Sequence, residues 1–124
     1  MHHEVRKQYW GYSPEETLDV KQILAVKYQG IRPAPGYPSQ PDHTEKETMW
    51  NVMKVKEETG IELTESLAML PASSTCGLYF GNKCASYFSV DEIQLDQVES
   101  YAKRKGMKLE TAEKWLAPIL GYEK

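Results

Sequence analysis

Residues 61–90, Ile-Glu-Leu-Thr-Glu-Ser-Leu-Ala-Met-Leu-Pro-Ala-Ser-Ser-Thr-Cys-Gly-Leu-Tyr-Phe-Gly-Asn-Lys-Cys-Ala-Ser-Tyr-Phe-Ser-Val, decide the fold class. Short apolar runs alternate here with Pro, Gly, Ser and Asn, which is typical of short strands joined by turns. The runs are residues 61–63, 66–69, 77–80 and 86–90. Helical patterns lie on both sides of this stretch. We therefore expect an α+β fold in which a small antiparallel sheet is flanked by helices.

The stretch before the predicted sheet carries the clearest helix pattern. Asp42 stands three residues before Glu45, as in a capping box, and an apolar stripe continues up to Glu58. The stripe consists of Met49, Trp50, Met53 and Val55. Gly60 stands where a helix C-cap is expected. The sequence therefore predicts one continuous helix over residues 42–58.

Helices are also predicted nearer both ends of the chain. An amphipathic pattern over 97–105 stops at Gly106, and a further helix over 111–116 is cut short by a proline. Residues 5–10 read as the end of a helix, and a short helix with Asp19 as its cap is expected over 19–27. A chain that starts inside a helix indicates a piece of a larger domain.

Composition and charge exclude several functional classes. The chain has 124 residues, with 15 basic and 18 acidic side chains and a net charge of −3, so no broad basic surface is available for nucleic acid. No apolar run approaches the ~20 residues that cross a bilayer, so no membrane partner is expected. The spacing of Cys76 and Cys84 does not match a metal-binding or redox motif and is typical of free thiols in the reducing cytoplasm. On sequence alone, a disulfide between them remains an alternative.

The proline-rich loop at residues 31–41 is the most informative candidate site. Its four prolines exclude regular helix and strand and fix the backbone, while Gly36 permits close approach of a ligand. Arg32 can grip a carboxylate with two parallel hydrogen bonds, and Tyr37 offers an aromatic face to a ring or a sulfonium. A rigid connector between two helices remains the alternative on composition alone.

Other reactive side chains favour structural interpretations. His2, His3 and Glu4 are adjacent and point in different directions on a helix, so a frayed terminus is expected in place of a metal site. His43 is expected to help cap a helix. Ser73–Cys76 lacks the pattern of a hydrolase nucleophile. The sequence therefore predicts no catalytic residue and no metal ligand.

Several unusual motifs, in order along the chain, resemble the activation domain of cobalamin-dependent methionine synthase. They are Gly30–Pro38, Pro41–Lys46, Leu63–Ser66, Gly77–Phe80 and Trp115–Pro118. The sequence Gln-Pro-Asp-His-Thr-Glu-Lys at residues 40–46 resembles the corresponding sequence of the animal enzymes more than that of the bacterial ones. The resemblance covers nearly the whole chain. It implies that residues 1–124 are the C-terminal portion of a single S-adenosylmethionine-binding domain, without the upstream part and the other enzyme modules.

The same resemblance implies a set of ligand contacts. Arg32 would meet the methionyl carboxylate, the backbone around Ala34 and Gly36 would hold the nucleoside, and Tyr37 would lie near the transferred methyl group and the corrin. Further contacts are implied for Tyr87 and Phe88, which period-two alternation sends to opposite faces of a strand. An acidic residue of the upstream part would complete the pocket.

The implied function is the reductive methylation of cob(II)alamin, which reactivates methionine synthase, a methyltransferase of methionine biosynthesis. Cobalamin would be bound mainly by another domain of the enzyme, and a flavoprotein of the methionine synthase reductase type would supply an electron. The isolated chain would not be catalytically competent. The alternative is an interaction module that docks the reductase or the cobalamin domain without a ligand of its own. An independent methyltransferase is disfavoured because the Gly-rich turn of the Rossmann class is missing.

Overall fold

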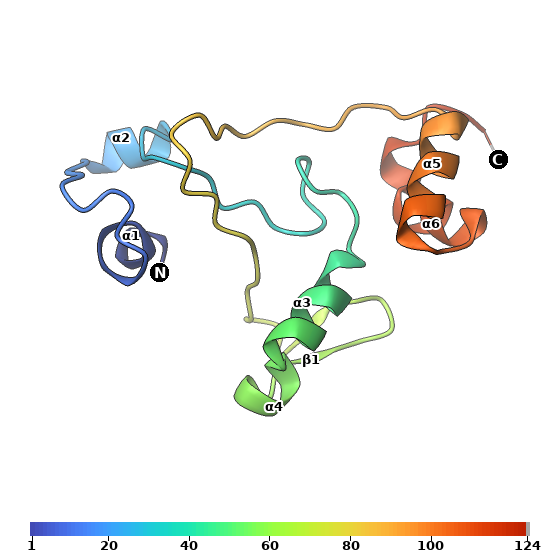
Figure 1. Ribbon diagram of the computed structural model, residues 1–124, viewed down its shortest axis with the longest axis horizontal. Coiled ribbons are helices and arrows are strands. Elements are labelled where there is room, and N and C mark those ends of the chain that lie inside the picture. Colours follow the sequence, from blue (N-terminus) through green and yellow to red (C-terminus); the bar gives the residue numbers. More distant parts are fainter. Residues whose placement is uncertain (124) are drawn as a thin grey trace. The chain divides into compact units, whose positions relative to one another are not determined.

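The computed structural model (Figure 1) describes residues 1–123. The chain divides into two compact units. The first unit contains Met1–Pro33 and Gly77–Tyr87, and the second contains Ala34–Cys76 and the chain from Phe88 onward. The chain therefore leaves the first unit inside the proline-rich loop and re-enters it at Gly77.

The first unit begins with a helical segment. Helix α1 (His2–Glu4) continues as the π-helix η1 (Val5–Tyr9), where the Trp10 amide donates to the Val5 carbonyl at 3.1 Å. Inside the unit, the buried Arg6 donates from Nε to Glu16 Oε2 at 2.6 Å. The helix predicted over residues 5–10 is confirmed, but it is a π-helix, which is wider than an α-helix.

Helix α2 (Val20–Leu24) begins at the predicted cap. The Asp19 carboxylate accepts from the Gln22 amide, and the Gln22 side chain accepts from the Asp19 amide, each at 2.8 Å. The helix is shorter than the predicted 19–27 because Val26 has a φ of 55°, which no α-helix accommodates. Val20 and Leu24 remain exposed, so the apolar stripe does not pack within the described residues.

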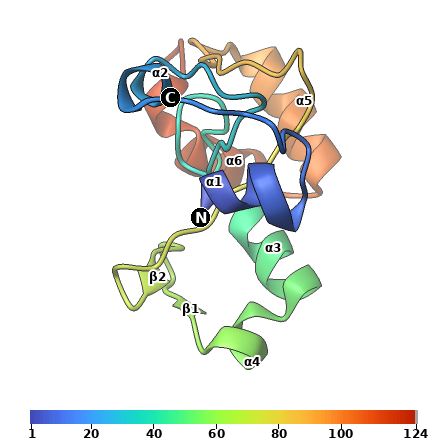
Figure 2. The same cartoon turned by 90° about the vertical axis from the view of Figure 1, so that its left-hand side faces the viewer.

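The predicted sheet is a two-stranded hairpin. Strands β1 (Glu62–Leu63) and β2 (Met69–Leu70) are antiparallel, with Glu62 opposite Leu70 and Leu63 opposite Met69 (Figure 2). The α+β class is thus confirmed. The strands expected at 77–80 and 86–90 are wrong.

Proline explains why residues 77–80 form no strand. Phe80 and Ile31 exchange two backbone hydrogen bonds at 3.0 Å, and the Leu78 amide donates to the Pro33 carbonyl at 2.9 Å. Pro33 has no N–H with which to extend the ladder. The pairing therefore ends as an isolated bridge.

In the second unit, the helix predicted over 42–58 is divided. Helices α3 (Glu45–Met53) and α4 (Val55–Thr59) meet at Lys54, whose φ of 49° interrupts the helical hydrogen bonds. Gly60 ends α4 in the left-handed conformation with a φ of 72°, as predicted. The capping box at Asp42 is wrong because Thr44 occupies the N-cap position.

Asp42 instead links α3 to a helix late in the chain. Its buried carboxylate accepts from the Thr44 amide at 2.7 Å and from the Thr44 hydroxyl at 2.6 Å. The Tyr101 hydroxyl also donates to it, and Lys105 Nζ lies 3.3 Å away. Asp42 therefore anchors the segment that leads from the proline-rich loop into α3.

Helices α5 (Leu95–Lys105) and α6 (Leu109–Trp115) pack against each other (Figure 1) and form a hydrophobic core. The short 3-10 helix η2 (Ala117–Ile119) contains Pro118. The buried core residues are Val98, Ala102, Ala112 and Leu116. Both predicted helices are confirmed, and each starts two residues earlier than predicted. Among residues 1–123, no helix is long and apolar enough to cross a membrane.

Candidate functional site

The proline-rich loop forms a closed turn. The Gly36 amide donates to the Gln40 carbonyl at 2.8 Å, and the Gln40 amide donates to the Tyr37 carbonyl at 2.8 Å. The Tyr37 amide also approaches the Ala34 carbonyl, at 3.3 Å. These hydrogen bonds give Ala34, Gly36 and Tyr37 a defined backbone conformation before any ligand arrives. Such preorganisation lowers the entropic cost of binding.

Gly36 fits against a histidine ring. Its φ is 90°, and a Cβ added to it would lie 2.1 Å from His43 Cε1. The imidazole therefore fills the space where any other residue would place its side chain. The expectation that His43 caps a helix is wrong, since α3 has no side-chain cap.

Lys46 holds the His43 ring in place. Lys46 is 6% exposed, and its Nζ lies 3.0 Å from His43 Nδ1 and 2.7 Å from the Leu67 carbonyl. Burial, followed by the charge of Lys46, lowers the pKa of His43, while Asp42 opposes that shift. The ring is therefore neutral at pH 7, and its Nδ1 accepts from the ammonium.

Two aromatic residues of the second unit present exposed faces. Tyr37 is 66% exposed and Phe88 is 60% exposed. The Val90 amide donates to the Pro38 carbonyl at 2.8 Å, which fastens the segment after Phe88 to the proline-rich loop. Both aromatic residues are thus accessible to a ligand or to a partner surface.

Arg32 and Tyr87 belong to the first unit and contact each other. The Arg32 amide donates to the Tyr87 hydroxyl at 2.9 Å. Burial and then the Tyr87 hydroxyl raise the pKa of Tyr28, whereas Arg32 lowers it, so both lie beside Tyr28. Among residues 1–123 no carboxylate lies within ion-pair distance of Arg32, and its side chain is exposed. Its guanidinium is available for an anionic group.

The structure brings together an aromatic cluster around His2 that sequence reasoning missed. The His2 ring meets Tyr28 edge-on at 4.7 Å between centroids and Tyr79 at 5.5 Å, and its Nε2 lies 3.3 Å from the Tyr12 hydroxyl. Burial, followed by the charges of Arg6 and Arg32, lowers the pKa of His2 to about 4. The expectation of a frayed terminus is wrong for His2. No local pattern could have revealed these contacts because the tyrosines are far apart in sequence.

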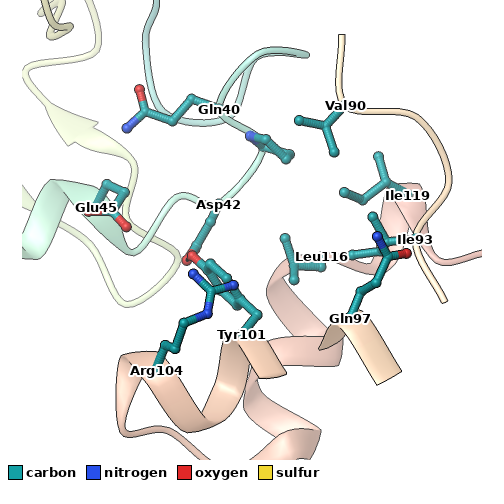
Figure 3. A pocket seen from close by; sticks show the side chains of 11 residues that line it. Gln40, Asp42, Glu45, Val90, Ile93, Gln97, Tyr101, Arg104, Leu116 and Ile119 are labelled. Atoms are coloured by element: carbon teal, nitrogen blue, oxygen red, sulfur yellow. Dashed lines mark hydrogen bonds between the residues drawn. The ribbon is translucent and has the colours of Figure 1, made fainter. Parts of the chain in front are cut away.

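A cavity of about 420 Å³ lies in the second unit (Figure 3). Its apolar side is formed by Val90, Ile93, Leu116 and Ile119, and Asp42 and Arg104 lie on its polar side. None of the six residues of the predicted ligand site lines it. Those six divide between the units, with Arg32 and Tyr87 in the first and Ala34, Gly36, Tyr37 and Phe88 in the second.

The chain is an α+β domain with a preformed proline-rich loop, and its described residues contain no group of three or more His, Cys, Asp or Glu side chains that could hold a metal ion. A family model described as vitamin B12 dependent methionine synthase, activation domain, matches residues 1–106. A crystal structure of the MetH reactivation domain bound to AdoHcy is 53% identical in sequence, with a TM-score of 0.91. That match covers 98% of this chain and 38% of the other. The chain therefore belongs to the activation-domain family of vitamin B12-dependent methionine synthase, as the sequence motifs predicted.

Proposed function

We propose that this chain binds S-adenosylmethionine and thereby serves the reductive reactivation of cobalamin-dependent methionine synthase. The observation that carries the proposal is the 53% identity, over 98% of this chain, to a reactivation domain with AdoHcy bound. AdoHcy differs from S-adenosylmethionine by the methyl group on sulfur, so one pocket can accept both. Sequence identity of that extent also favours a shared binding mode.

The residues of the loop have distinct roles in this proposal. Arg32 binds the methionyl carboxylate through two parallel hydrogen bonds, because its guanidinium is exposed and no carboxylate among residues 1–123 lies within ion-pair distance of it. Backbone groups at Ala34 and Gly36 contact the nucleoside, and Tyr37 lies near the methyl group and the corrin. Tyr87 and Phe88 supply further contacts. The preformed turn and the Arg32–Tyr87 hydrogen bond support these roles.

The chemistry of the reaction comes from its cofactors. When bound, S-adenosylmethionine would supply an activated methyl group and leave as AdoHcy. The acceptor would be cobalamin that has gained one electron from the flavoprotein and is held mainly by another domain. The contribution of this chain is to bind and orient the donor, which lowers the barrier through proximity. No side chain is needed as a general base. Because the methyl acceptor would be bound by another domain, we expect the chain alone not to catalyse methyl transfer.

The chain also fits the C-terminal portion of a larger activation domain. It spans 38% of the length of the matched reactivation domain. Large apolar side chains of the first unit are exposed, and exposed apolar surface of this kind marks places where protein packs. They include Tyr9 at 76%, Trp10 at 59%, Val20 at 71% and Leu24 at 79%. We propose that the rest of the domain covers them, and that the cobalamin domain and a cytoplasmic flavoprotein reductase are the partners.

Calorimetric titration with S-adenosylmethionine tests the ligand role. The Arg32→Ala variant loses charge-assisted hydrogen bonds worth about 1.5–3 kcal/mol, so affinity should fall by about 10- to 150-fold. Arg32→Lys keeps the charge but loses the planar fork and should recover only part of the affinity. Arg104→Ala, which removes an exposed arginine of α5, is the matched control and should leave affinity unchanged.

The alternative function predicts a different result. A module that only docks the reductase or the cobalamin domain would show no heat of binding in the wild-type chain, and Arg32→Ala would leave partner docking intact. Circular dichroism of each variant shows that the comparison is made between folded chains. Equal affinity of the wild type and Arg32→Ala would rule out the assigned role of Arg32.

A further inference from the structure

The conformation of the proline-rich turn depends on a side chain outside it. At a φ of 90°, Gly36 leaves open the space that a Cβ would take, and Cε1, Nε2 and Nδ1 of His43 all lie within 2.8 Å of that position. The Gly36 amide closes the turn by donating to the Gln40 carbonyl. Movement of the imidazole would therefore free Gly36 to change conformation and would weaken that hydrogen bond.

His43 is in turn fixed by a buried charge. Lys46 directs one donor to His43 Nδ1 at 3.0 Å and another to the Leu67 carbonyl at 2.7 Å. A lysine with 6% exposure is unusual in a protein interior unless its ammonium is hydrogen-bonded. The second hydrogen bond ties Lys46 to the hairpin region, so the ammonium cannot drift away from the ring without losing both partners.

We propose that His43 and Lys46 are positioning residues for the ligand-binding turn: the imidazole packs over Gly36, and Lys46 holds the imidazole there. The proposal rests on the proposed function, because it assigns the turn at Ala34–Tyr37 to ligand binding. Neither residue needs to touch S-adenosylmethionine. Their effect passes through the backbone of Gly36 and the hydrogen bond between Gly36 and Gln40.

The arrangement makes the turn sensitive to acid. Protonation of His43 places a hydrogen on Nδ1, so the ring can no longer accept from Lys46, and two positive charges then face each other. The charged neighbours of His43 are Lys46, which opposes its protonation, and Asp42, which favours it. The Trp115 ring, 6.3 Å away between centroids, carries no charge. The turn should loosen below the ordinary histidine range and stay intact at neutral pH.

Two variants separate the role of the hydrogen bond from the role of the ring. Lys46→Met retains the aliphatic stem and removes the donor, and His43→Phe retains an aromatic ring and removes the acceptor. Each should lower the affinity for S-adenosylmethionine by about 3- to 10-fold, the equivalent of one intramolecular hydrogen bond. Lys56→Met, in which an exposed lysine of α4 is replaced, is the matched control and should bind as the wild type does.

Backbone amide NMR provides a test that needs no ligand. The Gly36 and Gln40 signals should shift in Lys46→Met and His43→Phe while the α5 and α6 signals stay in place. Unchanged Gly36 and Gln40 signals in both variants would overturn the positioning role, whatever the affinity. If these signals shift but the wild-type chain binds no S-adenosylmethionine, ligand binding by this chain on its own fails and the coupling of His43 and Lys46 to the turn stands.

The pH dependence of ligand affinity is a further test, and it is measured first on the wild-type chain. Wild-type affinity should fall on acidification with the same midpoint as the His43 ring signals, and that midpoint should lie below 6.5. The α-carboxyl and α-amino groups of the ligand ordinarily titrate outside this window. His43→Phe should show no such step. A step of equal size in His43→Phe would contradict the assignment.

Discussion

The backbone amide of Arg32 donates to the hydroxyl of Tyr87 at 2.9 Å, across 55 residues of sequence. This hydrogen bond connects the start of the proline-rich loop to Tyr87, which is the last residue of the Gly77–Tyr87 segment of the first unit. It orients the backbone from which the Arg32 side chain projects. Tyr87, for which the family resemblance implied a ligand contact, thus also fixes the backbone of Arg32, another residue of the proposed site.

Removal of the Tyr87 hydroxyl should weaken ligand binding without unfolding the chain. Tyr87→Phe keeps the ring but leaves the Arg32 amide to water, so the expected loss is about 0.5–1.5 kcal/mol, or about 2- to 12-fold in affinity. Calorimetric titration with S-adenosylmethionine measures the change. Tyr9→Phe, at an exposed tyrosine of the same unit, is the control and should have no effect. Equal affinities of the two variants would show that this hydrogen bond does not support the site.

Glycine substitutions distinguish backbone strain from a steric clash. Gly36 and Gly60 both have positive φ, but a Cβ at Gly60 has no neighbour within 4 Å, whereas one at Gly36 meets His43. Gly60→Ala should therefore cost about 1 kcal/mol of stability through strain alone. Gly36→Ala should cost more and should also lower ligand affinity. Urea unfolding and calorimetry report the two effects, and equal losses of stability would contradict the packing of His43 on Gly36.

Three helix ends were predictable from sequence because a capping residue marked each of them. Asp19, Gly60 and Gly106 each ended or began a helix at the expected residue because capping depends on a few neighbouring positions. The break at Lys54 carried no such signal, since no glycine or proline marks it. The strand expected at 77–80 failed for a non-local reason, which is that its partner is the proline-containing segment at Ile31–Pro33.

The candidate site was only partly predictable for the same reason. The prolines and Gly36 indicated a rigid loop, and the motifs indicated a family. The contacts of His43 with Gly36 and Lys46 were missed because His43 lies at the start of a helical pattern, where a cap is the commoner role. Only the folded structure shows that the turn brings Gly36 against the His43 ring.

Loss of core packing should affect the second unit strongly. Leu116 is 4% exposed and packs with Val98, Ala102 and Ala112, so Leu116→Ala should destabilise the chain by about 2–5 kcal/mol. Leu24→Ala makes the same chemical change at a side chain that is 79% exposed and should alter stability by less than about 0.5 kcal/mol. Urea unfolding at pH 7 compares them. Similar losses would mean that Leu24 is buried in solution.

The carboxylate of Asp42 should make stability depend on pH in the acidic range. Burial alone would raise its pKa, but hydrogen bonds from Thr44 and Tyr101 and the charge of Lys105 lower it below the ordinary value of 3.8. The native chain therefore binds the proton less readily than the unfolded chain, so the stabilisation is complete above about pH 5 and is lost as pH falls through the native pKa. Asp42→Asn should lose about 1–3 kcal/mol at pH 7, and its deficit relative to the wild type should shrink as the pH falls below about 5. Asp91→Asn, at an exposed carboxylate, is the control and should be as stable as the wild type at pH 7. Urea unfolding at pH 7, 5 and 3 measures all three proteins, and a constant difference between the wild type and Asp42→Asn would mean that Asp42 has the same pKa in both states.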